Sequence, residues 1–326
     1  MTNTLAVTEL RHFQIKGNGS PNNEHRCQAH KNGRQQIEID IIIDAWAGPD
    51  GPVVSLTQDQ LRSVKLIKYD GGAVVDGQFS RSYERNVYEI LAGTKRDDQD
   101  SVDVNMSVIT FYVSLPESTN FVSLQLAAEI TLDGATFSTN NHESSPGGGL
   151  SNGGFNSSIQ VEPLAVYALK AGAFTISNEG GIGYGYDSGG TGEKRWLDLW
   201  AIRHQTSAYT IYGNDIPNQK PINWFSQYYQ GGGDEDRAHY ALPVLPRGSK
   251  VYLGFNKEGS SPHDCWIEPY TEAGTAYAVI EKASWFESHH YVSKGVTYYD
   301  QNGCGHFFYV NPHEKGSTFR LTDYSA

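Results

Sequence analysis

The stretch Ile37-Glu38-Ile39-Asp40-Ile41-Ile42-Ile43-Asp44 alternates isoleucine with acidic residues, with Ile42 as the one exception. Successive side chains of a β-strand point to opposite faces, so this pattern predicts a strand with one buried face and one wet face. Strands of this half-buried kind are typical of antiparallel sheets. The stretch therefore indicates an antiparallel β protein.

The same alternation recurs in both halves of the chain. Residues 109–115 and 122–132 each place apolar side chains at every second position, and the Pro116–Asn120 segment between them predicts a hairpin loop. Weaker alternation is found at residues 174–176, 251–255, 277–279 and 319–321. Strands are therefore expected along most of the sequence.

Helix signals are few. Thr57 and Gln60 have the spacing of a capping box in front of Leu61, which predicts one short helix linking strands. Residues 193–204 fit both a helical stripe and strand alternation, and their Trp and Ile content favours a strand. We expect an all-β protein with at most one or two short helices.

A run rich in Gly, Ser and Asn covers residues 140–158 and predicts a linker or a long exposed loop. It divides the chain into an N-terminal β domain, residues 1–139, and a C-terminal β domain rich in Gly and aromatic residues, residues 159–326. Each part has the length of a β-sandwich of the jelly-roll or immunoglobulin-like kind. We therefore expect two sandwich-like domains of mainly antiparallel strands.

The composition limits the class of partner. Acidic residues outnumber basic ones by 37 to 25, for a formal net charge of −12, whereas a nucleic-acid backbone is bound by clustered Lys and Arg. No apolar run approaches the ~20 residues that span a bilayer. We expect no nucleic-acid partner and no transmembrane segment.

The N-terminal residues lack the basic and apolar regions of a Sec signal peptide. The cysteine content, three residues at wide spacing, fits synthesis in a reducing compartment. We expect synthesis in the cytoplasm, with release by lysis or by a dedicated export route left open.

Two mirrored pairs, His263 with Cys265 and Cys304 with His306, suggest a zinc site. Residues i and i+2 of a strand share a face, so two neighbouring strands would bring two imidazoles and two thiolates together. The one-residue spacing is not that of a usual zinc knuckle. The favoured alternative is that Cys265 and Cys304 are ordinary buried thiols or pair as a disulfide outside the cell.

Two acidic runs, residues 97–103 and 234–236, raise the question of a calcium site. Calcium needs six to eight oxygen ligands from a turn that wraps the ion, and neither run has the order of an EF-hand loop. Solvated loop charge is the favoured interpretation, and calcium-dependent sugar binding is the minority hypothesis.

Aromatic residues gather beside glycine-rich loops in the second half. Exposed Tyr and Trp provide rigid amphipathic area for sugar rings or protein partners. The alternative is that these rings fill the core of a sandwich. The candidate ligand-binding residues are Trp224, Tyr228, Tyr229, Tyr184 and Tyr186.

The sequence has no H-E-x-x-H motif of a zinc-protease helix, and its G-x-S-x-G match, residues 149–153, lies in the Gly-rich run, where the strand and helix that flank a nucleophile elbow are not expected. Three hypotheses follow. The first is a non-enzymatic β protein that assembles with itself as a homo-oligomer or filament, or binds a cell surface. The second is a lectin-like or toxin-type protein that binds glycans or membranes through Tyr and Trp loops. The third is a hydrolase that uses a metal or paired carboxylates.

Overall fold

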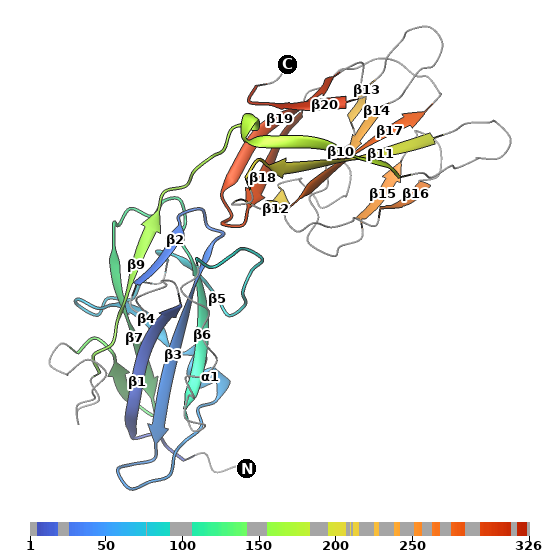
Figure 1. Ribbon diagram of the computed structural model, residues 1–326. Coiled ribbons are helices and arrows are strands. Elements are labelled where there is room, and N and C mark those ends of the chain that lie inside the picture. The colour runs from blue at the N-terminus through green and yellow to red at the C-terminus, as the bar shows by residue number, and fades with distance from the viewer. Residues whose placement is uncertain are drawn as a thin grey trace. The chain divides into compact units, whose positions relative to one another are not determined.

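The protein is described by a computed structural model (Figure 1). It describes residues 5–18, 26–75, 77–91, 106–141, 155–182, 195–206, 209, 211–214, 225–227, 238–241, 251–255, 263–267, 275–283, 294–313 and 318–324. The chain is mostly β, and it divides into two compact units, Met1–Val166 and Tyr167–Ala326. The expectation of an all-β protein built mainly from antiparallel sheets is confirmed.

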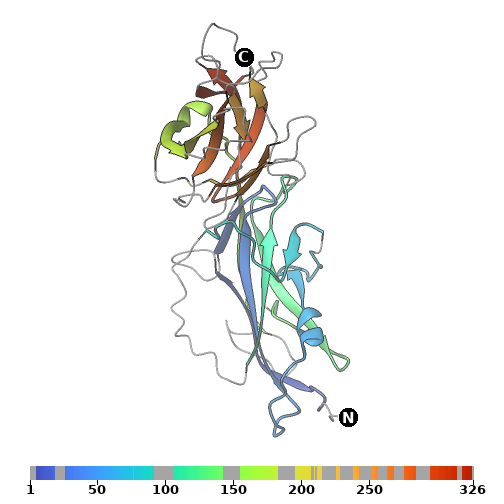
Figure 2. The ribbon, with the colours of Figure 1, turned by 90° about the vertical axis from the view of Figure 1, so that its right-hand side faces the viewer.

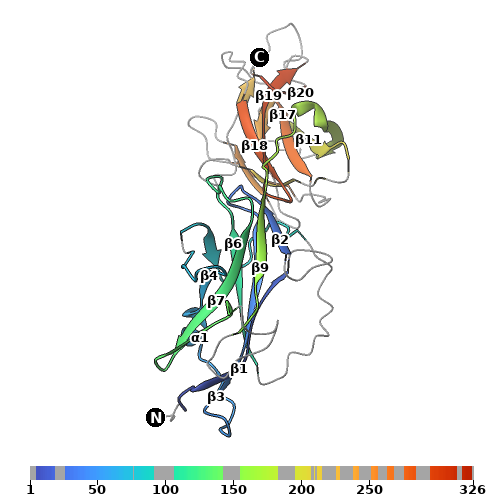
Figure 3. The same cartoon turned by 90° about the vertical axis from the view of Figure 1, so that its left-hand side faces the viewer.

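The first unit contains two sheets. One has the order β1-β3-β6-β5 and is antiparallel throughout, and the other has the order β2-β9-β7-β4, with β8 paired to β7. The strands are β1 (Glu9–Asn18), β2 (Arg26–His30), β3 (Gln36–Trp46), β4 (Lys65–Lys68), β5 (Ser80–Ser82), β6 (Ser107–Ser114), β7 (Leu124–Leu132), β8 (Ala135–Ser138) and β9 (Ile159–Leu164). Figure 3 shows β7 and β9, which pair antiparallel, whereas β2 and β9 run parallel.

The two sheets bury apolar side chains in one shared core. Ile37, Ile39 and Ile41 of β3 contribute from the first sheet, and Leu126 and Ile130 of β7 contribute from the second. The isoleucine face predicted at residues 37–44 is therefore buried in a core to which both sheets contribute.

The predicted hairpin at Pro116–Asn120 is wrong. β6 pairs with β3 and β5, whereas β7 pairs with β4, β8 and β9, so residues 115–123 cross from one sheet to the other. Alternation shows which face of a strand is buried, but two strands facing each other across a core have the same pattern as two paired strands. The sequence could not distinguish the two arrangements.

The second face of β3 is less exposed than the alternation predicts. Asp40 is only 3% exposed and Ile42 is also buried. The Oδ1 atom of Asp40 accepts a hydrogen bond of 2.6 Å from the Thr110 hydroxyl on the adjacent strand β6. A buried carboxylate needs such donors to offset lost hydration. Glu38, Asp44 and Trp46 on this face are partly exposed.

The short helix expected after Thr57 is confirmed as α1 (Gln58–Arg62), drawn in light blue in Figure 2. Thr57 is its N-cap. The Gln60 amide donates to the Thr57 hydroxyl at 3.3 Å, and the Gln60 side chain accepts from the Thr57 amide at 2.9 Å. Leu61 is buried in the core of the first unit. The capping box thus fixes where the helix begins.

The edge of β1 is partly closed by the segment that leads into β9. The Ser157 hydroxyl accepts a hydrogen bond from the Ile15 amide and donates one to the Ile15 carbonyl, both at 3.1 Å. Nearby, the Phe155 ring meets the Phe13 ring edge to face, with 6.0 Å between centroids. An unpaired strand edge offers its backbone groups to other chains, so this cover removes one pair of them.

Replacing Ser157 with Ala is expected to destabilise the first unit by about 1–3 kcal/mol, because the buried Ile15 amide and carbonyl lose their partner. Urea unfolding followed by far-UV circular dichroism measures this. Ser123→Ala is the matched control: it removes an exposed hydroxyl whose change should stay within about 0.5 kcal/mol. Equal midpoints for the two variants would contradict the role of Ser157.

The boundary between the units differs from the sequence-based division. β9 pairs with β2 and β7, and Phe155 belongs to the core of the first unit, so residues 155–166 lie in that unit. The sequence placed residues 155–158 in a linker and residues 159–166 in the second domain. The Gly-rich composition of residues 140–158 shows a loop, but it carries no information on which sheet the following strand joins.

The second unit contains a five-stranded sheet of order β10-β11-β17-β14-β13 and a four-stranded sheet of order β12-β18-β19-β20. The strands of the first are β10 (Phe174–Ile182), β11 (Arg195–His204), β13 (Phe225–Gln227), β14 (Ala238–Ala241) and β17 (Ala276–Ala283). Those of the second are β12 (Ile211–Asn214), β18 (Lys294–Asp300), β19 (Gly305–His313) and β20 (Thr318–Thr322). A separate pair joins β15 (Val251–Phe255) to β16 (His263–Ile267), and a 3-10 turn, η1, covers Ala171–Ala173.

The two larger sheets of the second unit share a core. Phe174 and Ile202 come from the five-stranded sheet, and Val296, Tyr298 and Phe308 come from the four-stranded sheet. The strand favoured for residues 193–204 is confirmed as β11. Within the residues that the structure describes, no helix is long and apolar enough to cross a membrane.

Candidate functional site

The β18–β19 hairpin turn of the second unit carries a buried polar cluster around Asp300. The chain reverses over Asp300-Gln301-Asn302-Gly303-Cys304, with Gly303 in the left-handed region at φ 71°. The Oδ1 atom of Asp300 accepts hydrogen bonds from the Asn302 amide at 2.9 Å and the Cys304 amide at 3.0 Å. An aspartate that binds the amides following it in this way stabilises a turn.

The other carboxylate oxygen of Asp300 connects the turn to two side chains. Its Oδ2 atom accepts from the Tyr167 hydroxyl and lies 3.2 Å from Nε2 of His306. The Asn302 side-chain amide donates to the Tyr167 oxygen at 3.1 Å. Asp300 and His306 are each 1% exposed. Asp300 thus receives four hydrogen bonds on its two carboxylate oxygens away from water.

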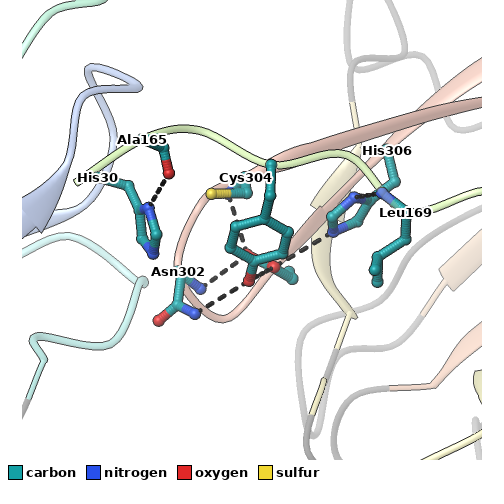
Figure 4. A network of polar contacts seen from close by, with 8 residues as sticks. His30, Ala165, Leu169, Asn302, Cys304 and His306 are labelled. Atoms are coloured by element: carbon teal, nitrogen blue, oxygen red, sulfur yellow. Dashed lines mark hydrogen bonds and ion pairs between the residues drawn. The ribbon is translucent and has the colours of Figure 1, made fainter.

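The tautomer of His306 follows from its neighbours. The Leu169 amide donates to Nδ1 of His306 at 3.0 Å, so Nδ1 carries no proton and Nε2 carries it toward Asp300 (Figure 4). The imidazole also lies among aromatic rings, with its centroid 5.8 Å from Tyr167 and 6.1 Å from Phe174. His306 therefore connects the hairpin to the chain segment that opens the second unit.

The cluster also affects Tyr167. Burial and the hydrogen bond to Asp300 both raise the pKa of the Tyr167 hydroxyl far above its usual range. The low-dielectric surroundings and the adjacent negative charge both oppose ionisation of the phenol. Tyr167 therefore stays protonated and remains a hydrogen-bond donor to Asp300.

An aspartate hydrogen-bonded to a histidine is also part of catalytic triads, in which the second ring nitrogen faces a nucleophile. In His306 the second nitrogen accepts the Leu169 amide instead, so neither nitrogen is left to exchange a proton with a substrate. The arrangement is a clamp, and we call Tyr167, Leu169, Asp300, Asn302 and His306 the Asp300 clamp. It fixes the start of the second unit to the β18–β19 hairpin.

The four residues of the zinc hypothesis lie on different elements. His306 is in β19 and Cys304 is in the turn before it, whereas His263 and Cys265 are in β16, which pairs with β15. Both ring nitrogens of His306 are engaged in hydrogen bonds. The side chains of His263 and Cys265 lie outside the described part of the chain, so the zinc site stays a prediction.

No group of three or more His, Cys, Asp or Glu side chains among the described residues is placed to hold a metal ion. The acidic runs at residues 97–103 and 234–236 fall outside the described residues. The five aromatic candidates fall outside them as well: Trp224, Tyr228, Tyr229, Tyr184 and Tyr186.

An exposed aromatic surface lies on the opposite side of β18 and β19 from the core. Phe307 of β19 is 52% exposed. A Cβ atom added to Gly295 of β18 would lie only 2.5 Å from Cζ of Phe307, so the ring rests on the bare glycine backbone. The Tyr309 ring meets Phe307 edge to face, with 5.1 Å between centroids and 81° between planes.

The strand register defines which residues share this surface. Phe307 is opposite Thr297, Tyr309 is opposite Gly295 and Thr322, and Asn311 is opposite Arg320. Val310 and Phe319 of the same strands are buried on the other side. We call this surface the outer face; its described residues are Gly295, Thr297, Tyr299, Gly305, Phe307, Tyr309, Asn311, Arg320 and Thr322. Of these, Tyr299 and Asn311 are buried.

The sequence reasoning missed both features. Asn302-Gly303 is a strong hairpin signal that would have located the turn, but nothing in the sequence connects Tyr167 to Asp300. Phe307 would be read as part of an apolar run with Phe308, because only the register shows that the two rings face opposite ways.

Comparison with protein families, with curated proteins and with solved structures finds no match to this chain.

Proposed function

We propose that this protein is a non-enzymatic binding protein that attaches to a surface ligand through the outer face of its second unit. The observation that carries the proposal is Phe307, a large apolar ring that is half exposed within a strand. Most phenylalanine side chains are buried, because exposing apolar area to water costs about 25 cal/mol per Å². A ring that remains exposed to water in this way is available to contact a ligand.

The ring is also held in place before any ligand arrives. Gly295 provides a flat backbone seat, and Tyr309 contacts the ring from the side. A binding group that is already ordered loses little conformational entropy on association, which favours affinity. Phe307 and Tyr309 together thus form a rigid aromatic platform.

The Asp300 clamp supports the platform. Asp300 closes the hairpin whose two strands carry Gly295 and Phe307, and Tyr167 and Leu169 attach the preceding chain to it. The side chains of a binding site are positioned most accurately when they lie on rigid strands that are themselves held by further hydrogen bonds. The buried cluster is therefore assigned a positioning role for the outer face.

Replacing Phe307 with Ala is expected to weaken binding to glycan arrays and to cell surfaces by about fivefold or more, since removal of an aromatic anchor at an interface costs over about 1 kcal/mol. Val122→Ala is the matched control: Val122 is 89% exposed in the first unit, and its removal should leave binding unchanged. Unfolding curves of both variants confirm that they are folded.

Size-exclusion chromatography with light scattering tests whether the outer face binds a surface ligand or a second copy of the chain. If wild type is an oligomer and Phe307→Ala is a monomer, the face joins copies of the chain, as the self-assembly hypothesis holds, and the surface-ligand proposal falls. If Phe307→Ala binds surfaces as well as wild type does, or wild type binds none, the proposal is also overturned.

A further inference from the structure

We propose that the ligand of the outer face is an acidic saccharide, a sugar ring that carries a carboxylate. This inference rests on the proposed function and names its ligand class. It follows from the charge, the shape and the polar groups of the face.

The outer face differs in charge from the rest of the protein. The chain has 37 acidic residues against 25 basic ones, yet none of the described residues of this face is Asp or Glu. The one charged side chain among them is Arg320 on β20, and it is exposed. In an acidic protein, a face whose described residues include no carboxylate and one guanidinium is complementary to an anion at that guanidinium.

Arg320 is suited to a carboxylate. Its planar guanidinium donates two parallel hydrogen bonds to a carboxylate, which a lysine does not do. In the described part of the chain, Arg320 makes no ion pair with an acidic residue. Its donors therefore face solvent, where a ligand can reach them.

The register places Arg320 close to the aromatic platform. Tyr309 pairs with Thr322, and Arg320 lies two residues before Thr322 on the same face, one diagonal step from Tyr309. Diagonal neighbours in a sheet are about 7–8 Å apart. A sugar ring lying on Phe307 and Tyr309 thus extends its carboxylate toward Arg320.

Other ligand classes fit less well. The platform is a single half-exposed ring with the hydroxyl-bearing Thr297 and Thr322 on the same face, which suits a ring with both apolar and hydroxyl faces. An anionic membrane is disfavoured because the net charge is −12 and the outer face offers one described cation. A wide apolar protein interface is disfavoured because its central area would need several exposed rings.

The test is isothermal titration of the full-length protein with matched saccharides. The probes are a galacturonic acid hexamer and its methyl ester, and 3′-sialyllactose and lactose. At least one acid is expected to bind about tenfold or more tightly than its neutral partner, and this preference is expected to weaken at high salt. Equal binding of the acid and neutral forms overturns the inference.

Three variants assign the contributions of individual residues. Arg320→Gln is expected to remove the preference for the acid while neutral sugars bind as before. Phe307→Ala is expected to weaken the binding of both the acidic and the neutral saccharides. Gly295→Ala is expected to weaken both as well, because its new Cβ displaces the Phe307 ring, while the protein stays folded since the ring is exposed and can swing away.

The failure of this inference is distinguishable from the failure of the proposed function. If cell-surface binding depends on Phe307 but none of the acidic saccharides binds, the ligand class is wrong and the binding role of the face remains. If Arg320→Gln keeps the full preference for the acid, the assignment of Arg320 is overturned. If Phe307→Ala changes no binding at all, both proposals are lost together.

Discussion

Replacing Asp300 with Ala is expected to lower the free energy of unfolding of the second unit by about 3–5 kcal/mol. The substitution removes the acceptor for the Tyr167 hydroxyl, for Nε2–H of His306 and for the amides of Asn302 and Cys304. The bonds from Nε2 of His306 and from the Cys304 amide are buried, so water does not readily replace the lost acceptor there, whereas those from Tyr167 and Asn302 are partly buried.

Hydrogen exchange measured by mass spectrometry locates the effect. Amides of β18 and β19 are expected to lose protection in Asp300→Ala, while amides of β3 in the first unit serve as the internal control and should keep theirs. Asp300→Asn keeps the shape of the side chain but removes its charge and replaces one carboxylate oxygen, an acceptor, with an NH2 donor. This variant should therefore also destabilise the second unit. If Asp300→Ala unfolds at the same urea concentration as wild type, the clamp does not hold the hairpin.

The first unit is expected to lose stability at alkaline pH because of Cys27. Burial raises the pKa of the Cys27 thiol from 9.0 to about 12. As the pH rises, the unfolded chain therefore releases this proton at a lower pH than the folded chain. The contribution of Cys27 to the free energy of unfolding is complete below pH 9 and declines as the pH rises toward 12. At 1.36 kcal/mol per pH unit, about 3 kcal/mol is lost by pH 11.

The matched variant for this prediction is Cys27→Ala. Urea unfolding by circular dichroism from pH 7 to pH 11 should give the variant a smaller fall in stability than wild type. A fall is still expected in the variant, because burial also raises the pKa of Tyr69 and Tyr112 in the same unit. If the two proteins show the same dependence on pH, the Cys27 thiol does not titrate as stated.

Local patterns in the sequence predicted several elements correctly. Ile37, Ile39, Ile41 and Ile43 form the core face of β3. Thr57 begins the one described α-helix, and residues 195–204 form β11. These features depend on side chains within a few positions of each other, which is the range over which periodicity and capping act. A single sequence contains that information directly.

Features that join distant parts of the chain were not predictable. The separation of β6 from β7, the position of β9 in the first unit and the bond from Tyr167 to Asp300 each depend on which strands pair. In the sequence analysis His306 is one of four candidate ligands of a zinc hypothesis that is not the favoured interpretation, and that hypothesis stays a prediction. In the structure its two nitrogens instead contact Leu169 and Asp300.

The sequence by itself determined that this is a mostly β protein with strands buried on one face, because the alternation of side chains is a local property of the backbone. Tertiary structure alone decided which strands are neighbours, and therefore which face bears Phe307, Gly295 and Arg320. The physical reason is that strand pairing is made by backbone hydrogen bonds, which are the same for every residue, while the choice of partner depends on packing across the whole core.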